Sequence, residues 1–124
     1  MKNKILKRIA IDLDGTICET KKPGQSYEDV EPLPGAIEAL QKLKTEGFEI
    51  IIHTARNMAT HKSNVAKITA VQGPIITKWL EKYNCPYDEL SLGKPHVDFF
   101  IDDKAIQFTN WKDVMITLNK KIGV

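Results

Sequence analysis

Two aspartates, Asp12 and Asp14, stand two positions apart directly after a short apolar run. Residues two apart in a strand point to the same side, so both carboxylates should face the same space. One could act as a nucleophile toward phosphorus and the other as a proton donor, with Mg²⁺ suppressing their mutual repulsion. Gly15 permits a sharp turn that leaves backbone N–H groups free to meet an anion. The plainer alternative is an Asp-Gly turn that only ends a strand.

Three further residues have the chemistry to bind a phosphoryl group. Thr54 follows a second apolar run, where its hydroxyl and the N–H groups at Thr54 and Ala55 are suitable hydrogen-bond donors. Lys94, which lies between Gly93 and Pro95, could bring a compact positive charge to the same edge. Ordinary alternatives exist for each, because threonines often end strands and loop lysines are usually solvated.

A second pair of acids, Asp102 and Asp103, follows the bulky apolar run 99–101. Acids beside buried apolar residues are costly unless a cation or hydrogen-bond donors meet them. A surface turn explains such a pair equally well. A catalytic role is favoured by the joint arrangement. The first acidic pair, Thr54, Lys94 and the second acidic pair are four signals that occur in order, each at the end of a predicted strand.

The elements that must position these residues follow from hydrophobic patterning and from glycine and proline. The patterns predict strands at 8–13, 48–53, 87–92 and 97–101, and helices at 35–46, from Pro74 onward and at 111–119. The polar stretch 55–73 shows little periodicity and is predicted to be mostly loop.

Short apolar strands that alternate with helices indicate an α/β fold, a three-layer sandwich with a mostly parallel, Rossmann-like central sheet. In such sheets ligands bind beyond the carboxyl ends of the strands. All four polar signals are predicted to lie at that edge.

Composition places the chain among ordinary globular proteins. Its 124 residues suit a single domain covering 1–124, and 18 basic against 16 acidic residues give a formal charge of +2. So small an excess argues against a nucleic-acid-binding surface. Neither a signal peptide nor a membrane-spanning segment is predicted, and two cysteines make no disulfide framework, so a cytoplasmic protein is expected.

The histidines and cysteines add little chemistry of their own. His53, His61 and His96 lack metal-ligand spacing, although His96 stands two residues after Lys94 and could border the same site. Cys18 follows the Asp-Gly turn closely, but no base is placed to activate it, so a small buried thiol is the better interpretation.

At this point a family resemblance becomes specific. The run Ile11–Thr16 resembles the first motif, D-x-D-G-T, of phosphatases in the haloacid dehalogenase-like superfamily. Thr54, Lys94 and the run 101–103 are similar to its second, third and fourth motifs, so the likeness spans about residues 8–105. The run 93–104 also resembles small phosphatases of capsule and lipopolysaccharide biosynthesis.

The resemblance implies a mechanism. Asp12 would attack phosphorus to form an aspartyl-phosphate, and Asp14 would protonate the leaving oxygen and then activate water. Thr54 and Lys94 would hold and neutralise the phosphoryl oxygens. The ligands of Mg²⁺ would be Asp12, the Asp14 carbonyl and an acid of the fourth motif, with Asp103 favoured over Asp102.

The same resemblance makes the chain look capless. Neither the interval Gly15–Pro34 nor the interval Thr54–Lys94 has room for the folded cap domain that many relatives carry. Specificity would then come from the loops 21–27 and 57–73 or from a neighbouring subunit, and homo-oligomerisation stays open. Arg56, His61 and Lys62 either contact an anionic substrate or form a solvated polar loop.

The expected function is therefore a Mg²⁺-dependent phosphomonoesterase for a small phosphorylated metabolite, such as a sugar phosphate or a capsule or lipopolysaccharide precursor. A nucleotide or polynucleotide-end phosphatase is the alternative among enzymes. From other classes, a receiver-like signalling domain or a catalytically silent phosphate-binding module stays open. The receiver-like alternative is weakened by His53-Thr54, because a phosphoacceptor aspartate would be needed at the end of that strand.

Overall fold

The computed structural model describes residues 7–60, 62 and 64–122. Three strands and three helices alternate along most of the chain: β1 Lys7–Asp12, α1 Ala36–Thr45, β2 Phe48–Thr54, α2 Val65–Lys82, β3 Glu89–Leu92 and α3 Trp111–Ile122. A short 3₁₀ turn, η1 Tyr27–Asp29, lies in the long connection from β1 to α1. Three of the predicted strands and all three predicted helices are thus present.

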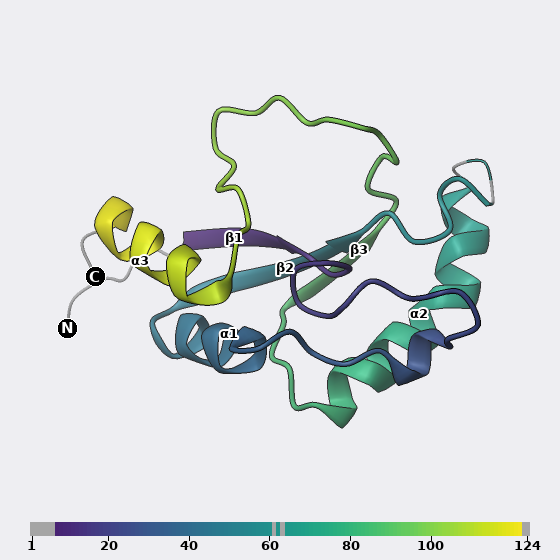
Figure 1. The fold of residues 1–124 in the computed structure, drawn as a ribbon, viewed down its shortest axis with the longest axis horizontal. Helices are drawn as coiled ribbons and strands as arrows, with labels where there is room; N and C mark the ends of the chain where they lie inside the picture. The colour runs from purple at the N-terminus through teal and green to yellow at the C-terminus, as the bar shows by residue number, and fades with distance from the viewer. Residues whose placement is uncertain (1–6, 61, 63, 123–124) are drawn as a thin grey trace.

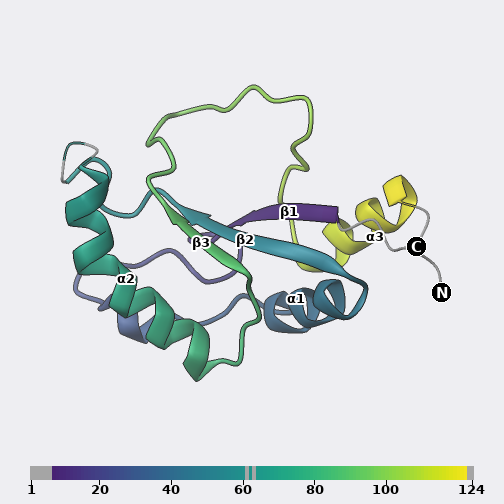
Figure 2. The same ribbon diagram turned by 180° about the vertical axis from the view of Figure 1, so that it is seen from behind.

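The three strands form one parallel sheet in the order β1-β2-β3. The parallel register sets Asp12 opposite His53 and Thr54 opposite Leu92, so the carboxyl ends of the strands meet at one edge. Figure 1 shows α1 and α2 on one side of this sheet, and Figure 2 shows the same arrangement from behind. The predicted α/β, Rossmann-like class is confirmed, and the described residues form no cap domain.

The core lies between the sheet and these helices. In β2 the alternate residues Phe48, Ile50, Ile52 and Thr54 are buried, and the amphipathic helix α1 buries Leu40 and Leu43 against the sheet. Both tryptophans are buried, as expected for packing residues, and each indole N–H donates to a loop carbonyl. The Nε1 atom of Trp79 donates to Val30 O and that of Trp111 to Thr16 O, each at 2.8 Å.

The prediction of a loop through residue 73 is wrong. Helix α2 begins at Val65, where the side chain of Asn64 accepts the N–H of Lys67, and it continues through Pro74. Its buried face contains Ile68, Gln72, Ile76, Trp79 and Leu80. The spacing is helical, but the polar Gln72 in the middle of this face hides the pattern in the sequence. The interval 57–73 is therefore a loop followed by more than two turns of helix.

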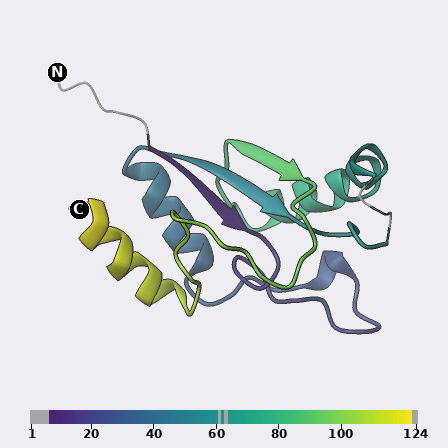
Figure 3. The same ribbon diagram turned by 90° about the horizontal axis from the view of Figure 1, so that it is seen from above.

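The predicted strand at 97–101 is also wrong. After β3 the chain turns at Gly93 and the segment 93–110 arches over the side of the sheet away from α1 and α2 (Figures 1 and 3). Within it Val97, Phe99, Phe100 and Ile101 are at least half exposed and join no ladder in the described sheet. An apolar run becomes a strand only where a neighbour supplies backbone partners, and here none does.

Candidate active site

The turn after β1 places the first two carboxylates. Asp12 ends the strand, and Leu13, which is buried, extends the pairing through its N–H to His53 O at 3.0 Å. The N–H groups of Ile17 and Cys18 then fold back onto Leu13 O at 2.9 and 3.1 Å. Asp12 and Asp14 consequently both line one cleft at the carboxyl edge of the sheet.

Lys94 reaches this edge from the end of β3. The N–H groups of Gly93 and Lys94 both donate to Thr54 O, at 3.2 and 3.0 Å, which fixes the turn against the end of β2. Gly93 has a φ of +112°, and a Cβ there would lie 3.0 Å from Cγ2 of Val65. The positive φ and the close approach of Val65 therefore both favour glycine at this turn. From it the ammonium of Lys94 extends to 3.3 Å from Oδ1 of Asp12.

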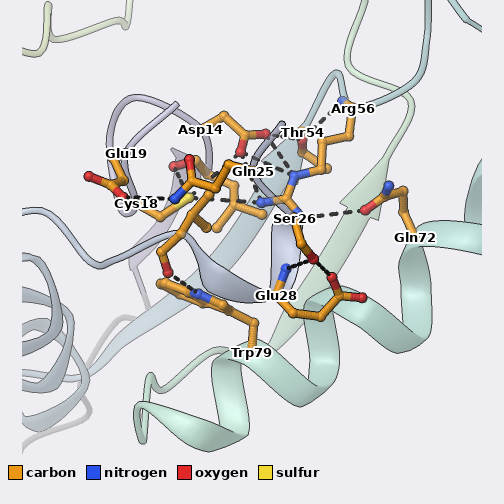
Figure 4. Close-up of polar contacts among 12 residues, drawn as sticks. Asp14, Cys18, Glu19, Gln25, Ser26, Glu28, Thr54, Arg56, Gln72 and Trp79 are labelled. Carbon is orange, nitrogen blue, oxygen red and sulfur yellow. Dashed lines mark hydrogen bonds and ion pairs between the residues drawn. The ribbon is translucent and has the colours of Figure 1, made fainter. Parts of the chain in front are cut away.

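A buried arginine holds the second carboxylate. The Nη2 atom of Arg56 donates to Oδ1 of Asp14 at 2.9 Å, and Nε lies 3.0 and 3.1 Å from its two oxygens. The hydroxyl of Thr54 donates to Oδ2 of the same carboxylate at 3.1 Å. Figure 4 shows Arg56, from the loop after β2, and Thr54, the last residue of β2, both directed toward Asp14.

The guanidinium of Arg56 is itself surrounded by protein. Its side chain is only 3% exposed, Nη1 donates to Oε1 of Gln72 in α2 at 3.3 Å, and the Tyr27 ring lies 4.1 Å from Cζ. Burial raises the pKa of the Tyr27 hydroxyl, and the positive charge of Arg56 partly offsets that rise. The network therefore ties together β2, α2 and η1 around Asp14.

Cys18 lies beside this network as a neutral thiol. Its Sγ is 3.6 Å from Oδ1 of Asp14. Burial, with a smaller contribution from the negative charge of Asp14, raises the pKa of Cys18 to about 12. A thiol with so high a pKa is a poor nucleophile at neutral pH, in agreement with the expectation of a small buried thiol.

The cleft has a volume of about 470 Å³. Its lining residues come from the end of β1 and from the connections that follow β1, β2 and β3. They comprise Asp12, Asp14, Thr20, Lys21, Tyr27, Ala55, Arg56, Asn57, Ala59, Thr60, Lys94, Pro95, His96, Val97 and Phe100. The two carboxylates on its floor are each paired with a cation, while Lys21 and His96 add polar groups at its walls. The arrangement has room and charge for a small anionic ligand.

The acids of the segment 93–110 are not part of this cleft. Asp102 and Asp103 are exposed, and the carboxylate of Asp102 accepts the N–H of Lys104 at 2.7 Å, as in an ordinary turn. In the described part of the chain, no group of three or more carboxylate, histidine or cysteine side chains could hold a metal ion. The carboxylate of Asp12 is paired with Lys94, and Asp102 and Asp103 do not line the cleft, so the expected magnesium ligands are not assembled in this arrangement.

Most of the residues singled out in the sequence are nevertheless brought together. Asp12, Asp14, Ala55 and Lys94 line the cleft, and Thr54 is buried beneath it with its hydroxyl on Asp14. The buried position of Arg56 was not expected, since the sequence offered it as a substrate contact or a solvated residue. Of the other two residues grouped with it, Lys62 is exposed, whereas His61 lies outside the described residues.

Helices long and apolar enough to cross a membrane are absent from the described residues. The search of curated proteins finds no match. A crystal structure of an MCSG target from Vibrio cholerae is 40% identical in sequence, with a TM-score of 0.76, and the match covers 94% of this chain and 99% of that one.

A second solved structure is D,D-heptose 1.7-bisphosphate phosphatase from B. bronchiseptica, complexed with magnesium and phosphate. It is 18% identical, with a TM-score of 0.51 and coverage of 96% of this chain and 65% of that one, which shows a shared fold. The sequence profile of the haloacid dehalogenase-like hydrolases matches residues 9–85, more than half of the chain. The chain therefore belongs to the haloacid dehalogenase-like hydrolase family.

Proposed function

We propose that the protein is a Mg²⁺-dependent phosphomonoesterase that acts through an aspartyl-phosphate on a small phosphorylated metabolite. The observation that carries this proposal is the position of Lys94, whose ammonium lies 3.3 Å from the carboxylate of Asp12 in a cleft that also contains Asp14. A nucleophilic carboxylate needs a cation beside it when it attacks an anionic phosphoryl group.

The charges of the cleft suit a phosphate dianion. Asp12 and Asp14 would repel such a ligand if they stood alone, but Lys94 and Arg56 each offset one of them. Lys21 then contributes positive charge at the wall of the cleft. Because these charges lie within a partly enclosed space, they act on the ligand more strongly than charges in open solvent.

The proposed reaction has two displacements at phosphorus. In the first, an oxygen of Asp12 forms a bond to phosphorus while the ester bond breaks. Asp14, protonated when the substrate binds, gives that proton to the departing oxygen and becomes the carboxylate that pairs with Arg56. In the second, Asp14 removes a proton from a water molecule that attacks phosphorus, which breaks the bond to Asp12 and releases phosphate. Lys94 and the N–H of Ala55 would hold the phosphoryl oxygens. The Thr54 hydroxyl, which the sequence assigned to the same role, donates to Asp14 instead.

Magnesium dependence enters this proposal through the family resemblance. The proposed ligands are Asp12, the carbonyl of Asp14 and Asp103, with Asp102 beside it. Because the described residues do not assemble these groups, no step above is routed through the ion. Binding of Mg²⁺ by these acids would require the part of the segment that carries Asp102 and Asp103 to move to the cleft, which residues 94–97 and Phe100 already line.

The substrate class is proposed to be a sugar phosphate or a related capsule or lipopolysaccharide precursor. A cleft of about 470 Å³ with several polar wall residues accommodates a molecule of that size. The fold neighbour named as a heptose bisphosphate phosphatase, complexed with magnesium and phosphate, supports the same class.

The test is phosphate release from p-nitrophenyl phosphate with and without Mg²⁺, followed by a panel of sugar phosphates. Asp12→Asn is the decisive variant, because an amide cannot form the covalent intermediate. The wild-type protein should release phosphate, and both Asp12→Asn and a chelator should abolish the release. An Asp12→Asn protein that retains full activity would overturn the proposed role of Asp12.

A further inference from the structure

Arg56 is an arginine whose hydrogen-bond donors are turned toward protein. Two of its nitrogens bind Asp14 and the third binds Gln72, and its side chain is 3% exposed although the residue borders the cleft. A planar guanidinium is well suited to grip a carboxylate through two parallel bonds. With those donors engaged, little of Arg56 is left to bind a ligand.

The guanidinium is in turn fixed by the scaffold. Gln72, itself 2% exposed, accepts from Nη1, and the Tyr27 ring covers one side of the group at 4.1 Å. The N–H of Arg56 also donates to the Thr54 hydroxyl at 3.0 Å, and the same hydroxyl donates to Asp14. Gln72 of helix α2 and Thr54 at the end of β2 therefore help to determine where the carboxylate of Asp14 lies (Figure 4). Turn η1 contributes through the Tyr27 ring.

We propose that Arg56 is a positioning residue that fixes the carboxylate of Asp14 for proton transfer, with Gln72 as its anchor. This inference rests on the proposed function, in which Asp14 moves the proton. A buried ion pair by itself is weak evidence for a stabilising role, because the desolvation of both charges opposes their attraction. An acid that must meet a departing oxygen does gain from being held, since small displacements reduce proton transfer steeply.

The test uses two esters of similar shape that differ in their need for a proton. Phenyl phosphate releases a basic phenoxide that requires an acid, whereas p-nitrophenyl phosphate releases a stable anion that does not. Arg56→Ala should lower kcat/KM for phenyl phosphate by about 100-fold, the range expected of general acid catalysis. This constant reports the first displacement, in which Asp14 is the acid, and excludes the later hydrolysis that both esters share. For p-nitrophenyl phosphate the loss should be less than about 10-fold.

Two milder variants keep the test informative if Arg56→Ala does not fold. Arg56→Lys preserves the charge without the two parallel hydrogen bonds. Its loss of activity should be smaller than that of Arg56→Ala, and again larger on phenyl phosphate than on p-nitrophenyl phosphate. Gln72→Ala leaves the ion pair in place but removes its anchor. It too should reduce activity more on phenyl phosphate than on p-nitrophenyl phosphate. Arg8→Ala is the matched control, because Arg8 forms only exposed ion pairs with Glu49 and Glu89; both rates should stay at wild-type values.

A double-mutant cycle separates positioning from a direct role. If Arg56 acts only through Asp14, then adding Arg56→Lys to Asp14→Asn should change kcat by less than about 3-fold. Equal losses of kcat/KM on the two esters, a rise in KM alone, or additive effects in the cycle would each overturn the inference while leaving the proposed function intact.

Failure of the proposed function would look different. A wild-type protein without activity on either ester, or an active Asp12→Asn protein, would overturn that function first. The positioning of Asp14 is then judged from crystal structures of the wild-type and Arg56→Lys proteins. The carboxylate should leave its wild-type rotamer in the variant, and an unchanged rotamer would contradict the inference.

Discussion

The ammonium of Lys94 and the carboxylate of Asp12 lie 3.3 Å apart, although 82 positions of sequence separate them. Each comes from the end of a different strand, and β2 lies between those strands in the sheet. The contact is therefore a consequence of parallel topology, in which the carboxyl ends of all strands reach one edge. It places a cation where an anionic ligand of Asp12 would need one.

The first prediction concerns this cation. Lys94→Ala should raise the inhibition constant of inorganic phosphate and lower kcat/KM for p-nitrophenyl phosphate by about 100-fold. Loss of one charged hydrogen-bond donor to a transferring group lowers the rate by about that factor. Lys104→Ala, an exposed lysine of the same segment, is the control and should leave both constants unchanged. Equal effects of the two substitutions would indicate general electrostatic attraction instead of a specific contact.

Much of this edge could be anticipated from the chain alone. The apolar runs before Asp12 and Thr54 each span one strand, and Gly47 follows α1 with the positive φ expected of a glycine after a helix. Once three such strands are parallel, the residues at their ends must meet. That argument brings Asp12, Asp14 and Lys94 together without any knowledge of side-chain contacts.

Two features could not be anticipated because they depend on distant neighbours. The run 97–101 has the residue types of a strand, but no sequence pattern shows whether a partner strand will offer it backbone hydrogen bonds. The pairing of Arg56 with Asp14 spans 42 positions and requires both the turn after β1 and the loop after β2. The available signal was an arginine two residues past a strand-end threonine, which is compatible with a solvated loop.

The second prediction concerns the turn that delivers Lys94. Gly93→Ala should destabilise the protein by about 1–3 kcal/mol, since the residue has a φ of +112° and the added Cβ would lie 3.0 Å from Val65. Gly73→Ala is the matched control, because Gly73 lies inside α2 with its nearest neighbour at 4.0 Å. That change should instead stabilise by about 0.5–1 kcal/mol.

Urea unfolding of the three proteins measures both effects. The strain argument makes a further distinction through Gly24, which has a φ of +82° but no atom within 4 Å of the added Cβ. The free energy of unfolding of Gly24→Ala should lie between those of Gly93→Ala and Gly73→Ala. A Gly93→Ala protein as stable as the wild type would show that this turn tolerates a side chain.

The third prediction concerns Asp88, which joins helix α1 to the sheet. Its carboxylate accepts from Lys44 Nζ at 2.7 and 2.8 Å and from the N–H of Ile50 at 2.8 Å, and the Lys44 hydrogen bonds lower the pKa of Asp88. A depressed pKa contributes stability above the unfolded-state value, about 3.9, and that stability disappears as the pH falls through the folded-state value.

Asp88→Asn should therefore reduce the free energy of unfolding at pH 7 by about 1 kcal/mol or less, because the pair is partly exposed. The difference from wild type should shrink steadily below pH 4. Asp98→Asn is the control for loss of charge, since Asp98 is exposed. A difference that stays constant from pH 7 to pH 3 would exclude the Lys44 interaction as its source.

The fourth prediction concerns the two thiols. Burial raises the pKa of Cys18 and of Cys85 to about 12, so almost no thiolate exists at neutral pH. Both should react with an aromatic disulfide reagent far more slowly in the native protein at pH 8 than in urea, where both become accessible. Chromatography of the cleaved, labelled protein assigns each rate to one cysteine.

Of the two cysteines, Cys18 is the one close enough to Asp14 to affect the reaction, because its Sγ lies 3.6 Å from Oδ1 of that residue. If the thiol only fills space, Cys18→Ala should lower the free energy of unfolding by about 1–2 kcal/mol through the small cavity it leaves, while kcat changes by less than about 3-fold. Cys85→Ala removes a second buried thiol, one that does not line the cleft, and calibrates the loss of stability. A Cys18→Ala protein that is folded, as stable as the Cys85→Ala protein and inactive would show instead that the thiol takes part in the reaction.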